Sequence, residues 1–287
     1  MKTIDGKEIA AKKLLKVKET VNRFEIEPAL AVVLIGNDPA SHVYVNLKEK
    51  AAKSIGVELR KYIFDKDVSK EEIKTVITFL NDDKDTHGII VQLPLPEHLD
   101  TDEIVSSIDP IKDVDGFHKV NQEKFMNNEV CVYPVFPHAI MSLIDSEIND
   151  IKNKKVVILG KSDVFDRVMT HALEVEGAQV QFIICDNKSE LNAKEQTIIN
   201  EADIIVTACG RKNLLSCDLV SNGTIIIDGG FSKDGKKVVG DVDVSNCKDR
   251  DIIISPVPGG VGPMTIACLL ENIVELTKEQ LLDDEKN

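Results

Sequence analysis

Two residues able to move protons, Tyr44 and Lys48, lie four positions apart in the stretch DPASHVYVNLKEKAAKSIG. Residues with this spacing lie on the same side of a helix, so we expect the phenol and the amine to be neighbours. A lysine withdrawn from water has a lowered pKa, and it can then act as a general acid or base near neutral pH. The alternative is a lysine whose methylene groups only cover an apolar edge.

A helix between Asp38 and Gly56 is expected to hold this pair. Asp38 suits the N-cap, Pro39 suits the first helical position, and Gly56 suits the left-handed residue after the last turn. Apolar residues recur every four positions, which predicts a buried seam with Tyr44 and Lys48 half-buried on its flank. The expected seam consists of Val43, Leu47, Ala51 and Ile55.

Gln92 and two aspartates are further candidates for a site. Gln92 lies at the end of a predicted strand over 88–93, and the carboxyl ends of strands are where open α/β sheets bind ligands. The prolines that follow could equally mark a stiff turn in which the glutamine is incidental. Asp113 and Asp115 lie in the turn KDVDGF, where solvated carboxylates are common, and the sequence does not distinguish a functional one from a structural one.

Another group of residues has features of a nucleotide site. A short apolar strand ends at Gly160, and Ser162 opens a helix whose N-terminus could bind a phosphate. The glycine pattern of this turn is poor, and Asp163 and Asp166 bring negative charge to a place where an anion would bind. Asp186 suits the 2′-hydroxyl of an adenine ribose and repels a 2′-phosphate, or it is an ordinary loop residue.

The run SPVPGGVGPMT, residues 255–265, contains three prolines and three glycines. Glycines let the backbone approach a flat ligand closely, and prolines fix the shape of the loop. Thr265 is expected to cap a closing helix over 266–276. This composition favours a binding loop over a purely structural one.

Strand and helix patterns alternate along the chain, which predicts mostly parallel sheets and an α/β fold. The polar, non-periodic segment 119–129 is the best candidate for a domain junction. The expected strands cover residues 29–36, 57–64, 88–93, 155–160, 179–184, 203–208, 224–228 and 251–254. The expected helices cover residues 7–24, 38–56, 69–80, 161–176 and 266–276.

Composition excludes several classes of function. The length of 287 residues suggests about two domains. With 35 basic and 49 acidic residues, the net charge of −14 argues against nucleic acid or an anionic membrane as partner and favours a small molecule. No leader or membrane span is predicted, so we expect a cytoplasmic protein. The six cysteines show no C-x-x-C pair, and neither a disulfide, nor a metal site, nor a cysteine nucleophile is expected.

The motifs in this order resemble those of the methylenetetrahydrofolate dehydrogenase/methenyltetrahydrofolate cyclohydrolase family. The resemblance runs from Ile4 to Asn272, and the motifs have roughly the spacings of that family. They are GNDPASHVYVNLKEKA, VQLPLP, KDVDGFH, ADIIVTACG, GDVDV and PVPGGVGPMTIACLLEN.

The resemblance implies an α/β protein with two domains around a cleft, and a homodimer. A folate-binding catalytic domain would cover residues 1–120 and be completed by 259–287. A Rossmann-like NAD(P)-binding domain would cover 134–256. The implied substrate is a tetrahydrofolate derivative, and the implied cofactor is NADP, with NAD as the alternative.

The resemblance also implies roles for single residues. Lys48 would be the central acid–base group, Tyr44 would position and polarise the one-carbon unit, and Gln92 would hydrogen-bond Lys48. Asp115 would hold the pterin, because a carboxylate can accept two N–H bonds from an aminopyrimidine edge. The residues expected to line the same pocket are Val257, Pro258, Gly259 and Gly260. The residues expected to bind the nucleotide are Gly160, Lys161, Ser162, Asp186 and Phe231.

The implied reaction is the oxidation of 5,10-methylenetetrahydrofolate to 5,10-methenyltetrahydrofolate with NAD(P), followed by hydrolysis to 10-formyltetrahydrofolate. The departures from the family pattern cluster around the nucleotide. Phe165-Asp166-Arg167-Val168 replaces the V-G-x-P that follows the family's G-R-S turn, and Ile184-Cys185-Asp186-Asn187-Lys188 stands where the family has C-H-S-x-T after the second strand. A cyclohydrolase with weak or lost dehydrogenase activity is therefore the alternative.

Two other classes of protein share some of these features. Tyr-x-x-x-Lys on a helix also marks short-chain dehydrogenases, but there the pair follows the glycine-rich turn, whereas here Tyr44 precedes Gly160 by 116 residues. A folate-binding protein without turnover would keep the shape of the site. It would have no need of a lysine with a lowered pKa, which favours an enzyme.

Overall fold

The computed structural model describes residues 1–161, 163–185, 191–235 and 237–284, so Ser162 and Asp186 lie outside the described part of the chain. Contacts divide the chain into two compact units. The first unit consists of Met1–Ala10 and Phe136–Thr265, and the second of Ala11–Val135 and Ile266–Asn287.

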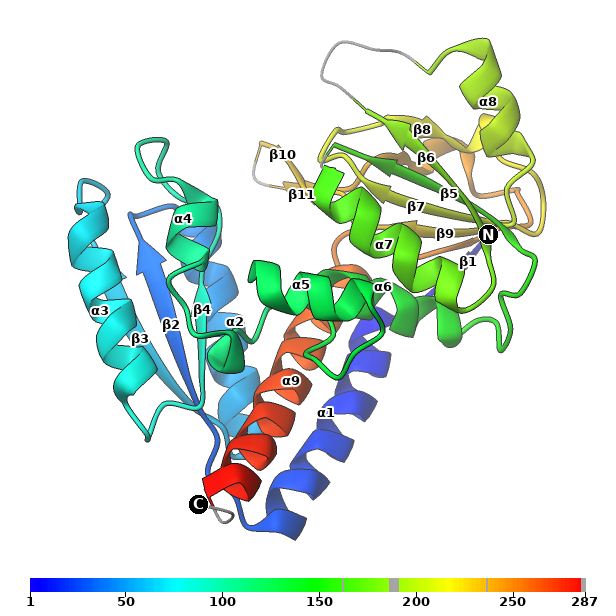
Figure 1. Ribbon diagram of the computed structural model, residues 1–287. Coiled ribbons are helices and arrows are strands. Elements are labelled where there is room, and N and C mark those ends of the chain that lie inside the picture. The colour runs from blue at the N-terminus through cyan, green and yellow to red at the C-terminus, as the bar shows by residue number, and fades with distance from the viewer. Residues whose placement is uncertain (162, 186–190, 236, 285–287) are drawn as a thin grey trace. The chain divides into compact units, whose positions relative to one another are not determined.

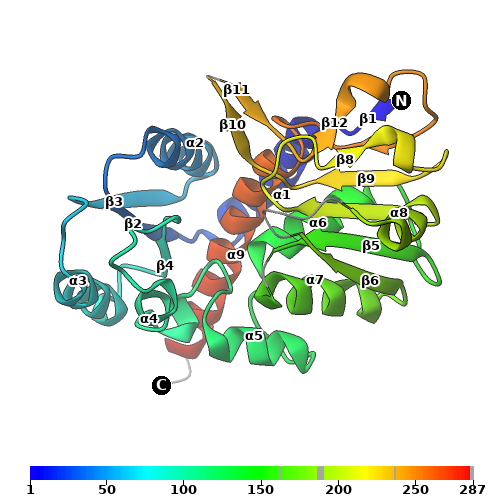
Figure 2. The same ribbon diagram turned by 90° about the horizontal axis from the view of Figure 1, so that it is seen from above.

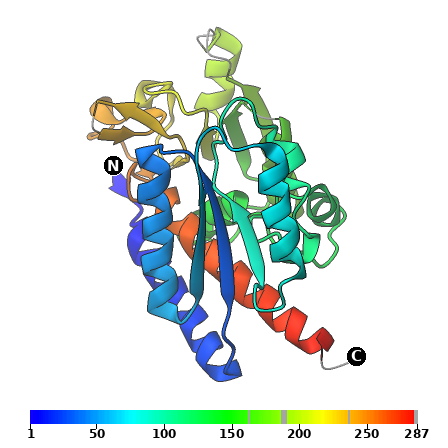
Figure 3. The ribbon, with the colours of Figure 1, turned by 90° about the vertical axis from the view of Figure 1, so that its left-hand side faces the viewer.

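The second unit is built on a three-stranded parallel sheet with the order β3-β2-β4. Its strands are β3 (Glu58–Phe64), β2 (Ala29–Ile35) and β4 (Gly88–Val91). Helix α2 (Pro39–Ile55) lies on one face of the sheet and α3 (Lys70–Asp82) on the other (Figures 2 and 3). Every residue of β2 is buried, as expected for a parallel strand covered on both faces.

Short helices follow β4 in the second unit. They are α4 (Thr101–Val105), the 3₁₀ turn η1 (Pro110–Lys112) and α5 (Lys119–Met126). The expectation of an irregular segment at 119–129 is therefore wrong for most of its length. Asn121 of α5 donates hydrogen bonds to the Pro110 carbonyl and to Asp113 Oδ2, both at 2.9 Å, and no local sequence pattern shows such tertiary bonds.

The first unit contains a six-stranded sheet in which all neighbours are parallel (Figure 1). Its strands, in spatial order, are β1 (Lys2–Thr3), β13 (Ile253–Ile254), β9 (Ile225–Asp228), β7 (Ile204–Ala208), β5 (Lys155–Gly160) and β6 (Gln179–Ile184). The helices between them are α6 (Val135–Asp145), α7 (Asp163–Val175) and α8 (Ala193–Asn200). The carboxyl ends of β5, β7 and β9 are adjacent, which is where such sheets bind ligands.

Two small sheets complete the first unit. β10 (Ser232–Asp234) and β11 (Lys237–Val239) form an antiparallel pair, and β8 (Leu215–Ser216) pairs in parallel with β12 (Val242–Asp243). The turns η2 (Cys217–Leu219) and η3 (Val244–Asn246) follow β8 and β12.

A disulfide joins Cys217 to Cys247, with a Cα–Cα distance of 5.4 Å, so the expectation of no disulfide is wrong. The two cysteines are 30 residues apart in sequence, and they meet only because β8 pairs with β12. Spacing along the chain carries no signal of that pairing.

Two long helices contribute residues to both units: α1 (Gly6–Phe24) and α9 (Val261–Asp284). Helix α9 begins earlier than the predicted 266–276, and Thr265 is not its cap: Thr265 Oγ1 donates to the Gly262 carbonyl at 2.7 Å within the first turn. Pro263 is tolerated there because the first turn of a helix does not use its N–H groups. Among the described residues, no helix combines the length and apolar character needed to cross a membrane.

Candidate active site

Helix α2 carries Tyr44 and Lys48 between the predicted ends. Asp38 is the N-cap and accepts a hydrogen bond from Ser41 N at 2.9 Å, and Gly56 has φ 85 and donates its N–H to the Ala52 carbonyl. Strong caps at both ends fix how far the helix runs, and therefore where its side chains lie relative to the sheet.

The buried face of α2 differs from the predicted seam. Val43 and Leu47 are 59% and 49% exposed, so two of the four expected seam residues face solvent. Lys48 lies within the buried face itself and not on its flank, whereas Tyr44 is half-buried as predicted. The buried residues of the helix are Ser41, Val45, Lys48, Ala52 and Ile55.

Lys48 is only 7% exposed, and its position is fixed by a polar neighbour. Its Nζ donates to Gln92 Oε1 at 3.1 Å, and Gln92 Nε2 donates in turn to the Leu93 carbonyl at 2.8 Å. The Nζ also lies 5.4 Å from the centre of the Tyr44 ring. Burial lowers the pKa of Lys48, while the negative charge of Asp115 opposes that shift. A lysine in these surroundings can lose its proton far more readily than one in water.

The structure separates the roles of the two aspartates in the turn KDVDGF. Asp113 is buried, and its carboxylate accepts from His118 N at 2.8 Å and from Asn121 Nδ2 at 2.9 Å. The half-buried carboxylate of Asp115 has no hydrogen-bond donor among the described residues and interacts electrostatically with Lys48. Burial raises the pKa of Asp115 to about 6, although the charge of Lys48 lowers it. Asp113 shapes the turn, and Asp115 remains available to a ligand.

Residues that sequence reasoning missed hold the turn in place. Asn272 of α9 donates through Nδ2 to the carbonyls of Val114 and Tyr133, both at 2.9 Å. Gly116 has φ +72, and a Cβ there would lie 3.0 Å from Pro134 Cα. The available signal was an asparagine within a largely apolar helical stretch, because a buried amide needs specific partners.

The proline- and glycine-rich loop belongs to the first unit. Gly259 and Gly260 are buried, Val257 is half-buried and Pro258 is exposed. Gly259 has φ +117, a conformation that disfavours any side chain, and Gly260 N donates to the Pro256 carbonyl at 2.7 Å. The loop therefore has one defined shape, and it belongs to a different unit from Lys48, Gln92 and Asp115.

The described nucleotide candidates Gly160, Lys161 and Phe231 also belong to the first unit. Gly160 ends β5, and a Cβ there would lie 2.9 Å from the ring of Phe182, so packing already favours glycine at this position. Lys161 is exposed directly after it. Phe231 is 54% exposed, and its carbonyl oxygen would lie 3.2 Å from a Cβ added at Gly210.

Two buried aspartates, neither predicted, fix the loops at this edge of the sheet. Asp241 accepts from Cys209 N at 2.7 Å and from Arg211 N at 2.6 Å. Asp228 accepts from Thr207 Oγ1 at 3.1 Å. The rigid turn after β7 and the positive charges of Lys161 and Arg211 fit a dinucleotide, whereas the acidic first turn of α7 opposes its phosphates.

Comparisons with known proteins cover almost the whole chain. The family model "Tetrahydrofolate dehydrogenase/cyclohydrolase, catalytic domain" matches residues 4–115, and the NAD(P)-binding domain model of the same name matches residues 134–281. The bifunctional protein FolD of Bacillus subtilis (strain 168) is 40% identical over 282 residues, which is 97% of this chain and 98% of that protein.

Solved structures give the same result. The bifunctional methylenetetrahydrofolate dehydrogenase/cyclohydrolase of Campylobacter jejuni is 38% identical, with a TM-score of 0.89 over 97% of this chain and 99% of that one. The Trypanosoma brucei dehydrogenase-cyclohydrolase, complexed with NADP and an inhibitor, is 30% identical, with a TM-score of 0.90 over 97% and 98%. These similarities extend through both units.

Proposed function

The chain belongs to the tetrahydrofolate dehydrogenase/cyclohydrolase family, and we propose that Lys48 is the acid–base group of its active site. The protein is a bifunctional enzyme of one-carbon metabolism. It oxidises 5,10-methylenetetrahydrofolate to 5,10-methenyltetrahydrofolate with NADP, and it hydrolyses that product to 10-formyltetrahydrofolate. Nothing favours a cyclohydrolase alone, because both domain models match.

One observation carries the proposal for Lys48. The residue is 7% exposed, burial lowers the pKa of its amine, and Nζ lies 3.1 Å from Gln92 Oε1. A snorkelling lysine would keep its ammonium group in water, which this one does not. Burying the Lys48 amine costs free energy, and an apolar side chain could fill the same space without that cost. Such a cost is typical of functional sites.

In the oxidation, a bound nicotinamide nucleotide would supply the acceptor for a hydride from the methylene carbon of the folate. The folate then carries a positive charge, so a neutral Lys48 beside it opposes the reaction less than an ammonium ion would. We propose that Lys161, Phe231 and the turn fixed by Asp241 hold the nucleotide. Tyr44 positions the one-carbon unit through its half-buried phenol.

In the hydrolysis, the neutral amine of Lys48 accepts a proton from water as the water oxygen bonds to the methenyl carbon. The bond from that carbon to N5 then breaks as the new hydroxyl group loses its proton to solvent, N5 takes a proton, and the carbon becomes the formyl group on N10. The balance is methenyl cation plus water to 10-formyltetrahydrofolate plus a proton. Lys48 can supply the proton that N5 takes, and the hydrogen bond with Gln92 keeps its amine oriented.

Folate recognition is assigned to Asp115 and to the loop Val257–Gly260. Asp115 has no donor among the described residues, so both carboxylate oxygens are open to two N–H groups of an aminopyrimidine. The defined shape of the loop suits a flat ring system. We further propose a homodimer, a cytoplasmic location, and a functional division between residues 1–120 with 259–287 and residues 134–256.

Both activities can be separated with one preparation of the purified protein. Supplied with methylenetetrahydrofolate and NADP, the enzyme should reduce the nucleotide; supplied with methenyltetrahydrofolate alone, it should form 10-formyltetrahydrofolate faster than buffer does. Absorbance spectroscopy follows both reactions. Hydrolysis without nucleotide reduction, by NADP or by NAD, would instead show a cyclohydrolase.

Removing negative charge from the first turn of α7 should tighten nucleotide binding. Asp163 is exposed there, and a carboxylate near a bound phosphate repels it. For Asp163→Asn we expect the Kd of NADP to fall by a factor of about two to five, as measured by calorimetry, which corresponds to roughly 0.3–1 kcal/mol. Asp150→Asn, in an exposed turn before β5, should leave the Kd unchanged. A higher Kd of NADP for Asp163→Asn than for the wild type would show that the phosphates do not bind near the first turn of α7.

A further inference from the structure

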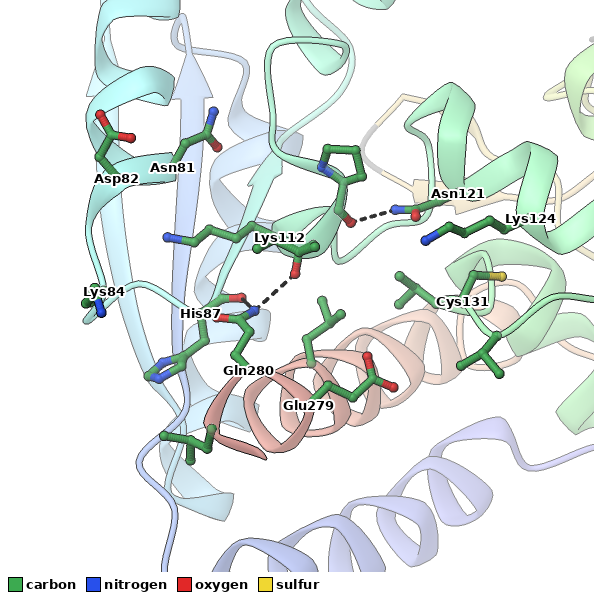
Figure 4. A pocket seen from close by; sticks show the side chains of 16 residues that line it. Asn81, Asp82, Lys84, His87, Lys112, Asn121, Lys124, Cys131, Glu279 and Gln280 are labelled. Carbon is green, nitrogen blue, oxygen red and sulfur yellow. Dashed lines mark hydrogen bonds between the residues drawn. The ribbon is translucent and has the colours of Figure 1, made fainter. Parts of the chain in front are cut away.

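A hollow lies in the second unit, at the opposite edge of the sheet from Gln92. His87, which lines it, immediately precedes β4, whereas Gln92 immediately follows that strand. The hollow has a volume of about 400 Å³, and its walls come from the end of α3, the turn η1, helix α5, the segment 130–132 and helix α9 (Figure 4). Neither Lys48 nor Asp115 lines it. This volume lies in the range of small-molecule sites.

The walls of the hollow are fixed by hydrogen bonds from side chains to backbone. Lys112 Nζ donates to the carbonyls of Leu80 at 2.9 Å and Asp83 at 2.7 Å. Gln280 Nε2 donates to the carbonyls of His87 at 2.7 Å and Ile111 at 3.0 Å (Figure 4). These bonds tie α9 and η1 to the ends of α3 and β4. A ligand would therefore meet a largely preformed surface and would lose little affinity to ordering it.

The polar groups of the lining that have no partner among the described residues include three from α5 and α9. Within the described ranges, the amine of Lys124 and the carboxylate of Glu279 make no hydrogen bond or ion pair, and Asn121 uses only its Nδ2 group. Lys124 comes from α5 and Glu279 from α9 (Figure 4). Both act on the half-buried thiol of Cys131: Lys124 lowers its pKa and Glu279 raises it, beside the larger effect of burial, which also raises it. Opposite charges from α5 and α9 thus act on the same thiol of the lining.

The charges determine which ligand fits. A simple anion would meet the carboxylate of Glu279, and a simple cation would meet the amine of Lys124, so either would face a like charge. A molecule with a carboxylate and an ammonium group satisfies both, and Asn121 Oδ1 can accept a further hydrogen bond from the ammonium group. Apolar lining from Val132 and Leu276 suits an apolar side chain.

We propose that this hollow binds a zwitterionic α-amino acid with an apolar side chain, with its carboxylate on Lys124 and its ammonium group on Glu279. The site is separate from the folate site, and the proposal does not depend on the reaction that the enzyme catalyses.

Calorimetry with L-leucine as the probe tests the proposal on the full-length enzyme. We expect a Kd on the order of 1 mM, since the ligand is small. Two analogues each lack one charge: 4-methylpentanoate has no ammonium group, and 3-methylbutylamine has no carboxylate. Each should bind at least about tenfold more weakly, which is roughly 1.4 kcal/mol.

Variants locate the binding. Lys124→Gln and Glu279→Gln should each raise the Kd of L-leucine about tenfold, while Lys119→Gln, exposed in the first turn of the same α5, should not. Methenyl hydrolysis should stay at the wild-type rate in all three, which reports that the fold is kept. The proposal is overturned if L-leucine does not bind up to about 10 mM, if 4-methylpentanoate binds equally well, or if Lys124→Gln binds like the wild type.

Discussion

Replacing Lys48 with methionine will lower the rate of methenyl hydrolysis by a factor of about 10² to 10⁴ and leave the fold intact. Methionine fills nearly the same space as the methylene chain of lysine but can neither accept nor donate the proton. Lys48 is only 7% exposed, so the change also removes a group that is costly to bury in its charged form. Hydrolysis is measured by the loss of methenyl absorbance, and folding by circular dichroism and the urea midpoint.

The matched control is Lys50→Met, two positions further along α2. Lys50 is exposed, so the same change in charge and composition should leave the rate within about twofold of the wild type. Wild-type hydrolysis by a folded Lys48→Met protein would show that another group handles the proton. An equal loss of rate in both variants would point to the net charge of the helix as the cause.

Local signals in the sequence were enough to predict the ends of α2 but not which of its faces is buried. Asp38 and Gly56 are caps whose chemistry is local, and both have the predicted roles. Burial depends on the sheet below, where small residues such as Ala52 allow close contact while Val43 stays outside. A four-residue apolar spacing cannot separate two faces that both contain apolar residues. The burial of Lys48 depends on Gln92, which is 44 positions away in the chain.

The same limit applies to the turn that holds Asp115. Both of its aspartates look alike in KDVDGF, and only their partners distinguish them. The carboxylate of Asp113 accepts hydrogen bonds from Asn121 and from backbone N–H groups. Asn272, far along the chain, donates a hydrogen bond to the carbonyl of Val114. Strand β1 was likewise not predicted, because a two-residue strand that pairs with β13 shows no periodicity. Local chemistry was predictable from the sequence, and contacts between distant segments were not.

Replacing Asp115 with asparagine should change both folate binding and the pH dependence of hydrolysis. The carboxylate is half-buried and has no donor among the described residues, so it is free to accept two charge-assisted bonds from the pterin. Losing them should cost about 1.5–3 kcal/mol and raise the KM for methenyltetrahydrofolate roughly 10- to 100-fold. In the wild type the pKa of Asp115 is about 6, so KM should also rise as the pH falls below that value. The variant should lack this rise.

Asp115→Asn should also change the pKa of Lys48. This change favours the neutral amine, whereas the loss of folate binding lowers activity. Hydrolysis needs the neutral amine, so kcat rises with pH through the pKa of Lys48. The negative charge of Asp115 raises that pKa, and asparagine removes the charge, so the rising limb of kcat should move to lower pH in Asp115→Asn. Asp67→Asn removes an exposed charge from the same unit and should shift neither KM nor the limb. If the rise of kcat with pH stays in place in Asp115→Asn, or moves to higher pH, then Asp115 does not act on the Lys48 amine. The two groups would then interact with the folate independently.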